Sequence, residues 1–202
     1  TEMAADAYQY AIQQTKEAQI KYLINQANIR TSEIKGTSVQ EFLQTLRDIK
    51  ADQKGYMLDN IEVSAYASPD GSMKVNTALA QKREQSSKKY VGESLKKNNL
   101  ETELDTRYTA EDWDGFQQLL QASNVQDKDI ILRVLSMYQD PEEREKQIRN
   151  ISAGYDELAK EIPPELRRAR LTIHYNLIGR SDDEIQEQLK TYASKLSVDE
   201  ML

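Results

Sequence analysis

The chain has 202 residues, enough for one large domain or two small ones, and a formal net charge of −7. That charge argues against a nucleic-acid-binding protein, which would present a basic face, and against docking on anionic lipid. Cysteine is absent and histidine occurs once, so disulfides, thiolate sites and multi-histidine metal sites are excluded, and no cofactor is expected.

The first half of the chain predicts helices that alternate with strands. Apolar residues at helical spacing predict helices over 3–17, 38–49 and 76–97, and a Ser-x-x-Glu capping box opens the second of these at Ser38. Strands are predicted over 20–24, 58–67 and 101–109, with a loop over 25–36.

The second half begins with a block of helices and ends with one strand and one helix. Helical spacing continues from Thr109 to Pro163, and Trp113 and Phe116 are predicted to be core residues. Residues 167–178 alternate as a strand does, and a capping box at Ser181 opens a last helix through about 194. This order predicts an α+β fold, with a sheet covered on one face by helices.

The segment 60–83 is the most informative part of the chain. A strand ends in the turn residues Ser68-Pro69-Asp70-Gly71, and a helix follows. Asn76 and Arg83 are about two helical turns apart on that helix, so both side chains point the same way. A strand end, a tight loop and an inward arginine predict an anion site, and the guanidinium fork suits a carboxylate.

Each of these residues also has a simpler interpretation. Arg83 could pair with an acid such as Glu84 or Glu62, and Asn76 could cap its helix. Asp70 could be a plain turn residue. Arg167 and Arg168 could be solvated charges at a strand edge instead of the rim of a ligand site.

Catalysis is not expected from this sequence. No serine nucleophile lies in a recognisable elbow, and His174 falls on the polar side of its strand, where a hydrogen-bonded surface histidine is the simplest interpretation. The acid pairs Glu142-Glu143 and Asp182-Asp183 lie in first helical turns, where the helix dipole favours negative charge. We therefore expect a binding protein and not an enzyme.

The helix motif resembles that of the OmpA-like domain of Gram-negative cell envelopes. Asn76-Thr77-Ala78-Leu79-Ala80-Gln81-Lys82-Arg83 matches the family pattern Asn-x-x-Leu-[Ser/Ala]-x-x-Arg, and Arg167-Arg168 and Ile24-Asn25 match its last and first strands. The resemblance covers about residues 18–178. It implies a βαβαβ(α insertion)β order with a mixed four-stranded sheet, and it implies peptidoglycan binding without bond cleavage.

The resemblance also implies roles for single residues. Arg83 inherits the contact to the carboxylate of the diaminopimelate side chain, Asn76 is a candidate for ligand contact, and Arg167 and Arg168 are candidates for the rim of the ligand site. The family holds the ligand's amino group with a strand-end Asp, and here Ser68 stands in that position, with Asp70 two residues further on.

Asp112-Trp113-Asp114-Gly115 and the long helical block resemble a subgroup of the family that is outer-membrane-associated and often lipid-anchored. The implied layout is an N-terminal helix or linker over 1–17, the domain over 18–180 with a helical insertion over 110–165, and a C-terminal helix and linker over 181–202. Because a capping box at Ser197 is followed by only a few residues, we expect the natural protein to continue past Leu202.

Two functions therefore remain open. The first is a periplasmic domain that recognises a peptidoglycan carboxylate through Arg83. The second is an assembly protein of the outer membrane whose peptidoglycan site has decayed and which binds envelope proteins through the helical insertion. Membrane association is expected only through an anchor outside this chain.

Overall fold

A computed structural model describes residues 10–69, 71–151, 158, 160–179 and 189–194. Its centre is a mixed four-stranded sheet in the order β1-β4-β2-β3. β4 (Arg168–Gly179) runs antiparallel to both β1 (Tyr10–Lys21) and β2 (Tyr56–Tyr66), and β3 (Glu103–Thr109) runs parallel to β2. The predicted α+β class and the mixed four-stranded sheet are confirmed.

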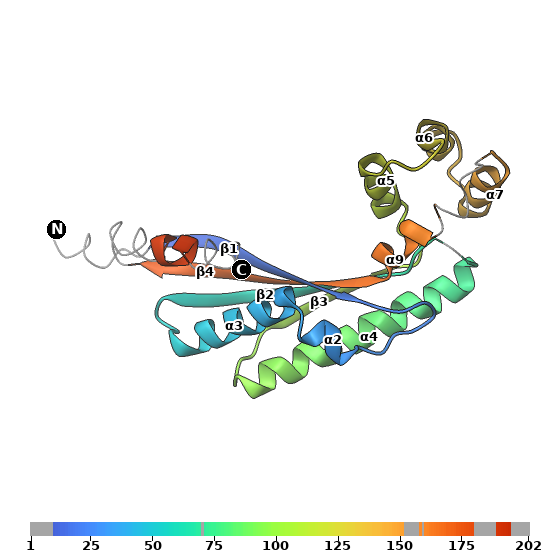
Figure 1. The fold of residues 1–202 in the computed structure, drawn as a ribbon. Coiled ribbons are helices and arrows are strands. Elements are labelled where there is room, and N and C mark those ends of the chain that lie inside the picture. Colours follow the sequence, from blue (N-terminus) through green and yellow to red (C-terminus); the bar gives the residue numbers. More distant parts are fainter. Residues whose placement is uncertain (1–9, 70, 152–157, 159, 180–188, 195–202) are drawn as a thin grey trace.

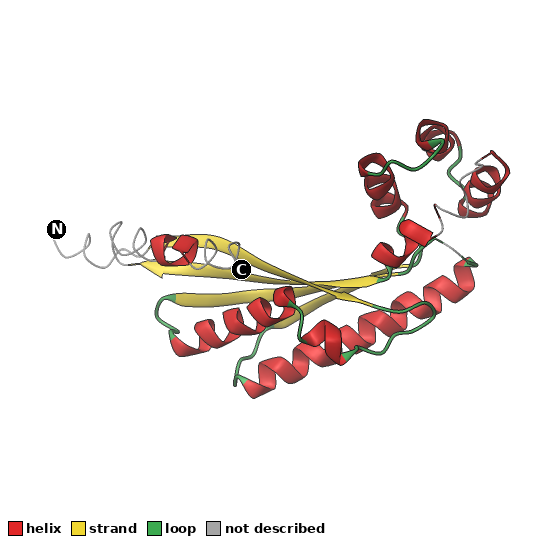
Figure 2. Cartoon of the chain, in the orientation of Figure 1, coloured by secondary structure: helices red, strands yellow, loops and turns green. Residues whose placement is uncertain are grey.

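Helices cover one face of this sheet (Figure 1). They are α3 (Thr37–Ala51) and α4 (Met73–Lys97), and the short α2 (Thr31–Ile34) precedes α3. Buried apolar side chains of β1, β2 and β4 pack with those of α3 and α4 in one core, and Figure 2 shows α3 and α4 along the same face of the sheet. The core of this layer includes Ile20, Phe42, Leu46, Ile61, Val63, Val91, Leu171 and Ile173.

The strand and helix periodicities explain this arrangement. On β2, Ile61, Val63 and Ala65 are completely buried, and the residues between them face the other side. On α3, the buried residues Val39, Phe42, Leu46 and Ile49 recur at the spacing of one helix face. Each large apolar side chain buried in this way contributes about 1.5–3 kcal/mol.

The predicted helical insertion forms a second, separate core. It consists of α5 (Trp113–Ala122), α6 (Lys128–Met137), α7 (Pro141–Ile151) and the short α9 (Pro163–Leu166), which lie beyond one end of the sheet (Figure 1). Its buried residues are Phe116, Leu120, Val125, Ile131, Val134, Leu135, Ile148, Leu158, Ile162 and Leu166. Phe116 is buried as predicted, and Trp113 packs against its ring at 5.3 Å between centroids.

Several predictions of local structure were wrong. Residues 10–17, predicted as helix, belong to β1, because twelve residues of β1 pair with β4 and this tertiary pairing overrides local helical spacing. The strand predicted over 20–24 ends at Lys21, and the predicted loop over 25–36 contains α2. Residues 189–194 are helical as predicted, whereas 3–9, the cap at Ser181 and the box at Ser197 lie outside the described residues.

Candidate functional site at the C-terminal end of β2

Four segments meet where β2 ends. The chain leaves β2 at Tyr66, turns at Gly71 with a φ of 106°, which glycine adopts without strain, and enters α4. The N-cap of α4 is Ser72, whose hydroxyl accepts from the Val75 N–H at 3.3 Å. Asn76 is therefore not the cap, because the helix starts three residues before it. The loop after β1 and the turn between β3 and α5 complete the site.

Arg83 is completely buried at this end of the sheet. Its guanidinium donates to three main-chain carbonyls, from Nε to Gln26 at 2.9 Å, from Nη1 to Tyr66 at 3.0 Å and from Nη2 to Leu23 at 3.2 Å. The Tyr22 ring lies 5.2 Å from the guanidinium carbon. Arg83 thus joins the loop after β1 to the end of β2, and a buried charge is tolerated there because carbonyl dipoles solvate it.

Asn76 and Ser68 are also buried, each only 3% exposed. In the part of the chain that the structure describes, neither Asn76 Nδ2 nor Ser68 Oγ has a hydrogen-bond partner. Buried polar atoms are nearly always paired, so two such atoms at one strand end mark the place as unusual. Asp70, the third predicted residue of this turn, lies outside the described residues.

Arg168 contributes side-chain contacts at the site, whereas Arg167 contributes a main-chain hydrogen bond. Arg168 is not a solvated edge charge: its side chain is 12% exposed, its Nη2 lies 3.5 Å from Asp112 Oδ2, and its guanidinium carbon lies 4.9 Å from the Tyr66 ring centroid. Its Nε has no hydrogen-bond partner among the described atoms. The Arg167 carbonyl accepts from the Tyr22 N–H at 2.7 Å, which closes the start of β4 onto the end of β1.

Two acids that were not predicted as site residues complete this end of the molecule. The turn between β3 and α5 lies against the residue that follows β2. Its Asp112 N–H donates to the Ala67 carbonyl at 3.2 Å. Burial raises the pKa of the Asp112 carboxyl, although its bond from the Gly115 N–H and the nearby Arg168 act in the opposite direction. The pKa of Glu111 is raised as well, mainly by burial and also by Glu145 and Asp140.

Asp112 is the N-cap of α5, and this role requires a glycine three residues later. Asp112 Oδ1 accepts from the Gly115 N–H at 3.0 Å. A Cβ on Gly115 would lie 2.4 Å from Asp112 Oδ2 and 2.9 Å from a Leu166 methyl group. The Asp-Trp-x-Gly segment of the sequence is therefore explained by the N-cap of α5 and the tight space at Gly115. This segment was the sequence signal from which Asp112 could have been predicted as a buried capping residue.

The polar face of the sheet holds the single histidine. His174 Nε2 lies 3.5 Å from Glu62 Oε2, and Glu62 also lies 3.9 Å from an Arg107 nitrogen. A hollow of about 560 Å³ lies beside them, lined by residues that include Gln13, Thr15 and Asn60. No group of three acids or histidines in the described ranges could hold a metal ion, and none of the described helices is long and apolar enough to cross a membrane.

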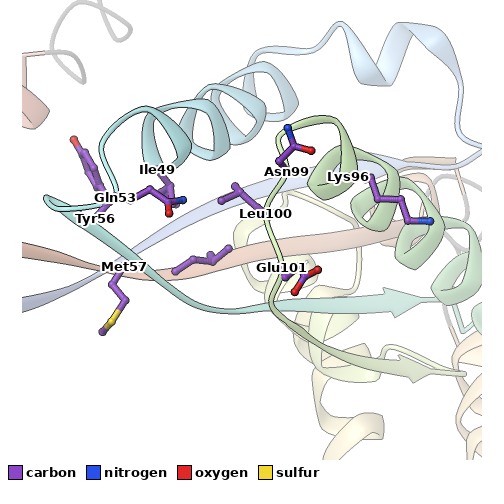
Figure 3. Close-up of a pocket in the computed structure, with 9 residues that line it drawn as sticks. Ile49, Gln53, Tyr56, Met57, Lys96, Asn99, Leu100 and Glu101 are labelled. Atoms are coloured by element: carbon purple, nitrogen blue, oxygen red, sulfur yellow. The ribbon is translucent and has the colours of Figure 1, made fainter.

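A second hollow, of about 590 Å³, lies at the opposite end of β2, between the ends of α3 and α4 (Figure 3). Ile49 lines it from α3, Gln53 lines it from the segment after α3, Lys96 lines it from α4, and Leu100 and Glu101 follow α4. None of the predicted site residues lines either hollow. Of the predicted residues that the structure describes, Ser68, Asn76 and Arg83 are buried at this strand end and lie outside both hollows.

Comparisons with known proteins find a likeness of arrangement among solved structures and none among family models or curated proteins. No family model matches the sequence, and no curated protein matches it. Among solved structures, the OmpA-like domain of FopA1 from Francisella tularensis subsp. tularensis SCHU S4 superposes with a TM-score of 0.41 at 9% identity, over 84% of this chain and 78% of that one. At those values no residue role passes from that protein to this chain.

Proposed function

We propose that this chain is a non-catalytic binding domain of the Gram-negative cell envelope, with its ligand site at the C-terminal end of β2. The observation that carries the proposal is a pair of buried polar atoms there, Ser68 Oγ and Asn76 Nδ2, that have no hydrogen-bond partner among the described residues. Such atoms are costly unless something pairs with them, and a ligand is one way to supply that partner. A peptidoglycan peptide is the proposed ligand, on the resemblance of the Asn76-to-Arg83 motif.

Arg83 has a more limited role in this proposal than the motif implies. Its three carbonyl bonds hold the loop after β1 and the end of β2 in place, so it organises the site. Direct contact with a ligand carboxylate would require the guanidinium to exchange carbonyl partners for that carboxylate. The motif spacing supports such contact, while the complete burial of Arg83 argues against it.

Co-sedimentation with purified cell-wall sacculi tests the proposal. We expect the wild-type chain to be retained and Asn76→Leu, which keeps the volume but removes the amide, to bind at least tenfold more weakly. Thr77→Val, at the next helical position, is the matched control and should bind as the wild type does. Thermal melting of all three proteins checks that they are folded. If the wild type is not retained, or if Asn76→Leu binds equally well, the proposed site is wrong.

An assembly role through the helical insertion is the second candidate. It is favoured by the insertion's separate core and by three exposed apolar side chains on α6 and α7: Ile130 at 46%, Met137 at 66% and Ile151 at 39%. A photo-crosslinking residue at Met137 would recover a protein partner under this function. The control is the same residue at Met57, which is 47% exposed on β2. If the crosslinking residue gives equal yields of protein adduct at Met137 and Met57, the helical insertion is not the docking surface.

The proposed location is the periplasm, in association with the outer membrane. Sequence resemblance supports this location, and any lipid anchor would lie outside this chain.

A further inference from the structure

The strand β3 forms one edge of the sheet, and the main chain along its outer side is open. β3 packs against β2 and α4. The Thr109 carbonyl accepts from the Ala67 N–H at 3.0 Å, so the Thr109 main chain points toward β2. Because main-chain groups alternate in direction along a strand, those of Leu104, Thr106 and Tyr108 point away from the sheet. Within the described part of the chain, these outward groups make no hydrogen bond.

The opposite edge of the sheet, along β1, is bonded near its end by side chains. The Gln19 N–H donates to Ser38 Oγ at 3.2 Å, and the Lys21 N–H donates to Glu33 Oε1 at 2.8 Å. Arg30 donates to the Lys21 carbonyl at 3.3 Å. Side chains that bond an edge strand occupy the groups that another strand would need. Among the described residues β3 has no such cover, so β3 is the edge that can accept another strand.

The sequence of β3 is complementary to itself when two copies run in opposite directions. With Thr106 at the centre, Thr106 lies opposite its counterpart, and Leu104 lies opposite Tyr108 of the second copy. Asp105 lies opposite Arg107 in the same register. Threonine pairs and pairs of opposite charge stabilise antiparallel strands, and a leucine beside a tyrosine ring buries apolar surface. This register therefore satisfies every position between Leu104 and Tyr108.

The outward main-chain groups fit the same register. In an antiparallel pair, facing residues whose main chains point toward each other exchange two hydrogen bonds. Thr106 and its counterpart meet this condition, and so do Leu104 and Tyr108, which lie two residues to either side. Asp105 and Arg107 then face each other at the positions between the hydrogen-bonded pairs, where opposite side chains lie closest.

The side chains concerned are accessible for this pairing. Tyr108 is 42% exposed, and the Arg107 side chain is 65% exposed and lies 3.9 Å from Glu62 Oε1, so a closer acid can replace that contact. Asp105 Oδ2 accepts from Asn60 Nδ2 at 2.6 Å, which leaves acceptor capacity on the carboxylate. Antiparallel pairing also sends the two helical insertions to opposite ends of the joined sheets, because α5 follows the end of β3 (Figure 1).

We propose that β3 binds the β3 strand of a second copy of this chain, which joins two four-stranded sheets into one continuous sheet. Both copies use the same strand around a two-fold axis at Thr106. The helical layers of both copies then lie on the same face of the joined sheet. A contact between two strand edges is small, which is typical of a transient association. The proposal goes beyond the ligand site at the end of β2 and does not depend on it.

Sedimentation equilibrium of charge variants tests the proposal. We expect the wild-type chain to exchange between monomer and dimer. Asp105→Arg and Arg107→Asp should each weaken the dimer at least tenfold, because each change places like charges opposite each other on both sides of the two-fold axis. The double variant should regain the wild-type affinity, since opposite charges face each other again. Asp129→Arg, at an exposed position of α6, is the control with the same change of charge and should dimerise as the wild type does.

A single introduced cysteine tests the register, because the chain has no cysteine of its own. Thr106→Cys should form an intermolecular disulfide under mild oxidation, since the two copies of this position face each other. Glu103→Cys, on the same strand, is the matched control. In the proposed register its two copies lie about 20 Å apart along the strands, which is beyond the reach of a disulfide.

Three results would each overturn the proposal. The first is a wild-type chain that stays monomeric at every concentration. The second is a double charge variant that dimerises as weakly as the single variants, with melting temperatures close to that of the wild type. The third is an equal disulfide yield from Thr106→Cys and Glu103→Cys.

Discussion

The helix α4 around Arg83 and the turn around Asp112 both bury a charge at the same end of β2, yet they differ in how the charge is satisfied. Arg83 donates to three carbonyls that belong to two other segments of the chain. The Asp112 carboxylate accepts one hydrogen bond at 3.0 Å, from the Gly115 N–H of its own helix. Its second oxygen lies 3.5 Å from Arg168 Nη2, beyond the usual length of a charge-assisted hydrogen bond.

This difference separates a structural charge from a charge that can bind a ligand. Removing a charge that is already engaged costs stability, because its partners become unpaired. A charge with unused acceptors can gain a new partner without breaking an existing bond. We therefore assign Arg83 mainly to the fold and the turn at Asp112 mainly to recognition, and the variants below test that division.

Replacement of Arg83 should have the largest effect on stability. Arg83→Met removes the donors to three buried carbonyls, so we expect the free energy of unfolding to fall by about 3–5 kcal/mol. The control is Arg107→Met, because the Arg107 side chain is 65% exposed and its loss should change stability by less than about 0.5 kcal/mol. Urea unfolding followed by circular dichroism measures both. Similar values for the two variants would show that Arg83 does not hold the fold together.

Gly115→Ala should have the next largest effect. The new methyl group would overlap the Asp112 carboxylate and Leu166, so we expect a loss of about 1–3 kcal/mol. Gly92→Ala on α4 is the matched control, since a Cβ there meets nothing within 4 Å. That control should gain about 0.5–1 kcal/mol, because alanine favours a helix more than glycine does. If both variants behave alike in urea unfolding, the tight packing of the turn is refuted.

The pH dependence of stability should show the smallest effect. Because burial raises the native pKa of Asp112 above its ordinary value of 3.8, the native state binds that proton more strongly than the unfolded state does. The contribution of Asp112 to stability should therefore fall as pH rises from about its ordinary pKa through its native pKa. Asp112→Asn should make this decline shallower, as measured by urea midpoints across the acidic range. If stability declines as steeply or more steeply with pH in Asp112→Asn as in the wild type, then Asp112 does not have a raised pKa in the native state.

The sequence predicted α3 and β2 because their apolar residues face one side at a regular spacing, which is a local property. It could not predict β1, whose strand form depends on pairing with β4 far along the chain. The burial of Arg83 was equally hidden, because its carbonyl partners Leu23 and Gln26 lie 60 and 57 residues away. The order of strand, turn and helix in the sequence places Ser68 and Asn76 near one strand end, because they are close in the chain. Glu111 and Asp112 reach that end through the parallel pairing of β3 with β2, which the sequence does not reveal.

The most direct test of the division between fold and recognition is nitrogen NMR of the arginine Nε–H groups during titration with meso-diaminopimelic acid. Arg83 Nε–H donates to the Gln26 carbonyl, whereas Arg168 Nε has no hydrogen-bond partner among the described residues and belongs to the guanidinium whose Nη2 lies 3.5 Å from Asp112 Oδ2. We predict that the Arg168 resonance shifts as the ligand binds and that the Arg83 resonance stays in place. A shift of Arg83 with Arg168 unmoved would show that the buried guanidinium on α4 meets the ligand, and would contradict this account.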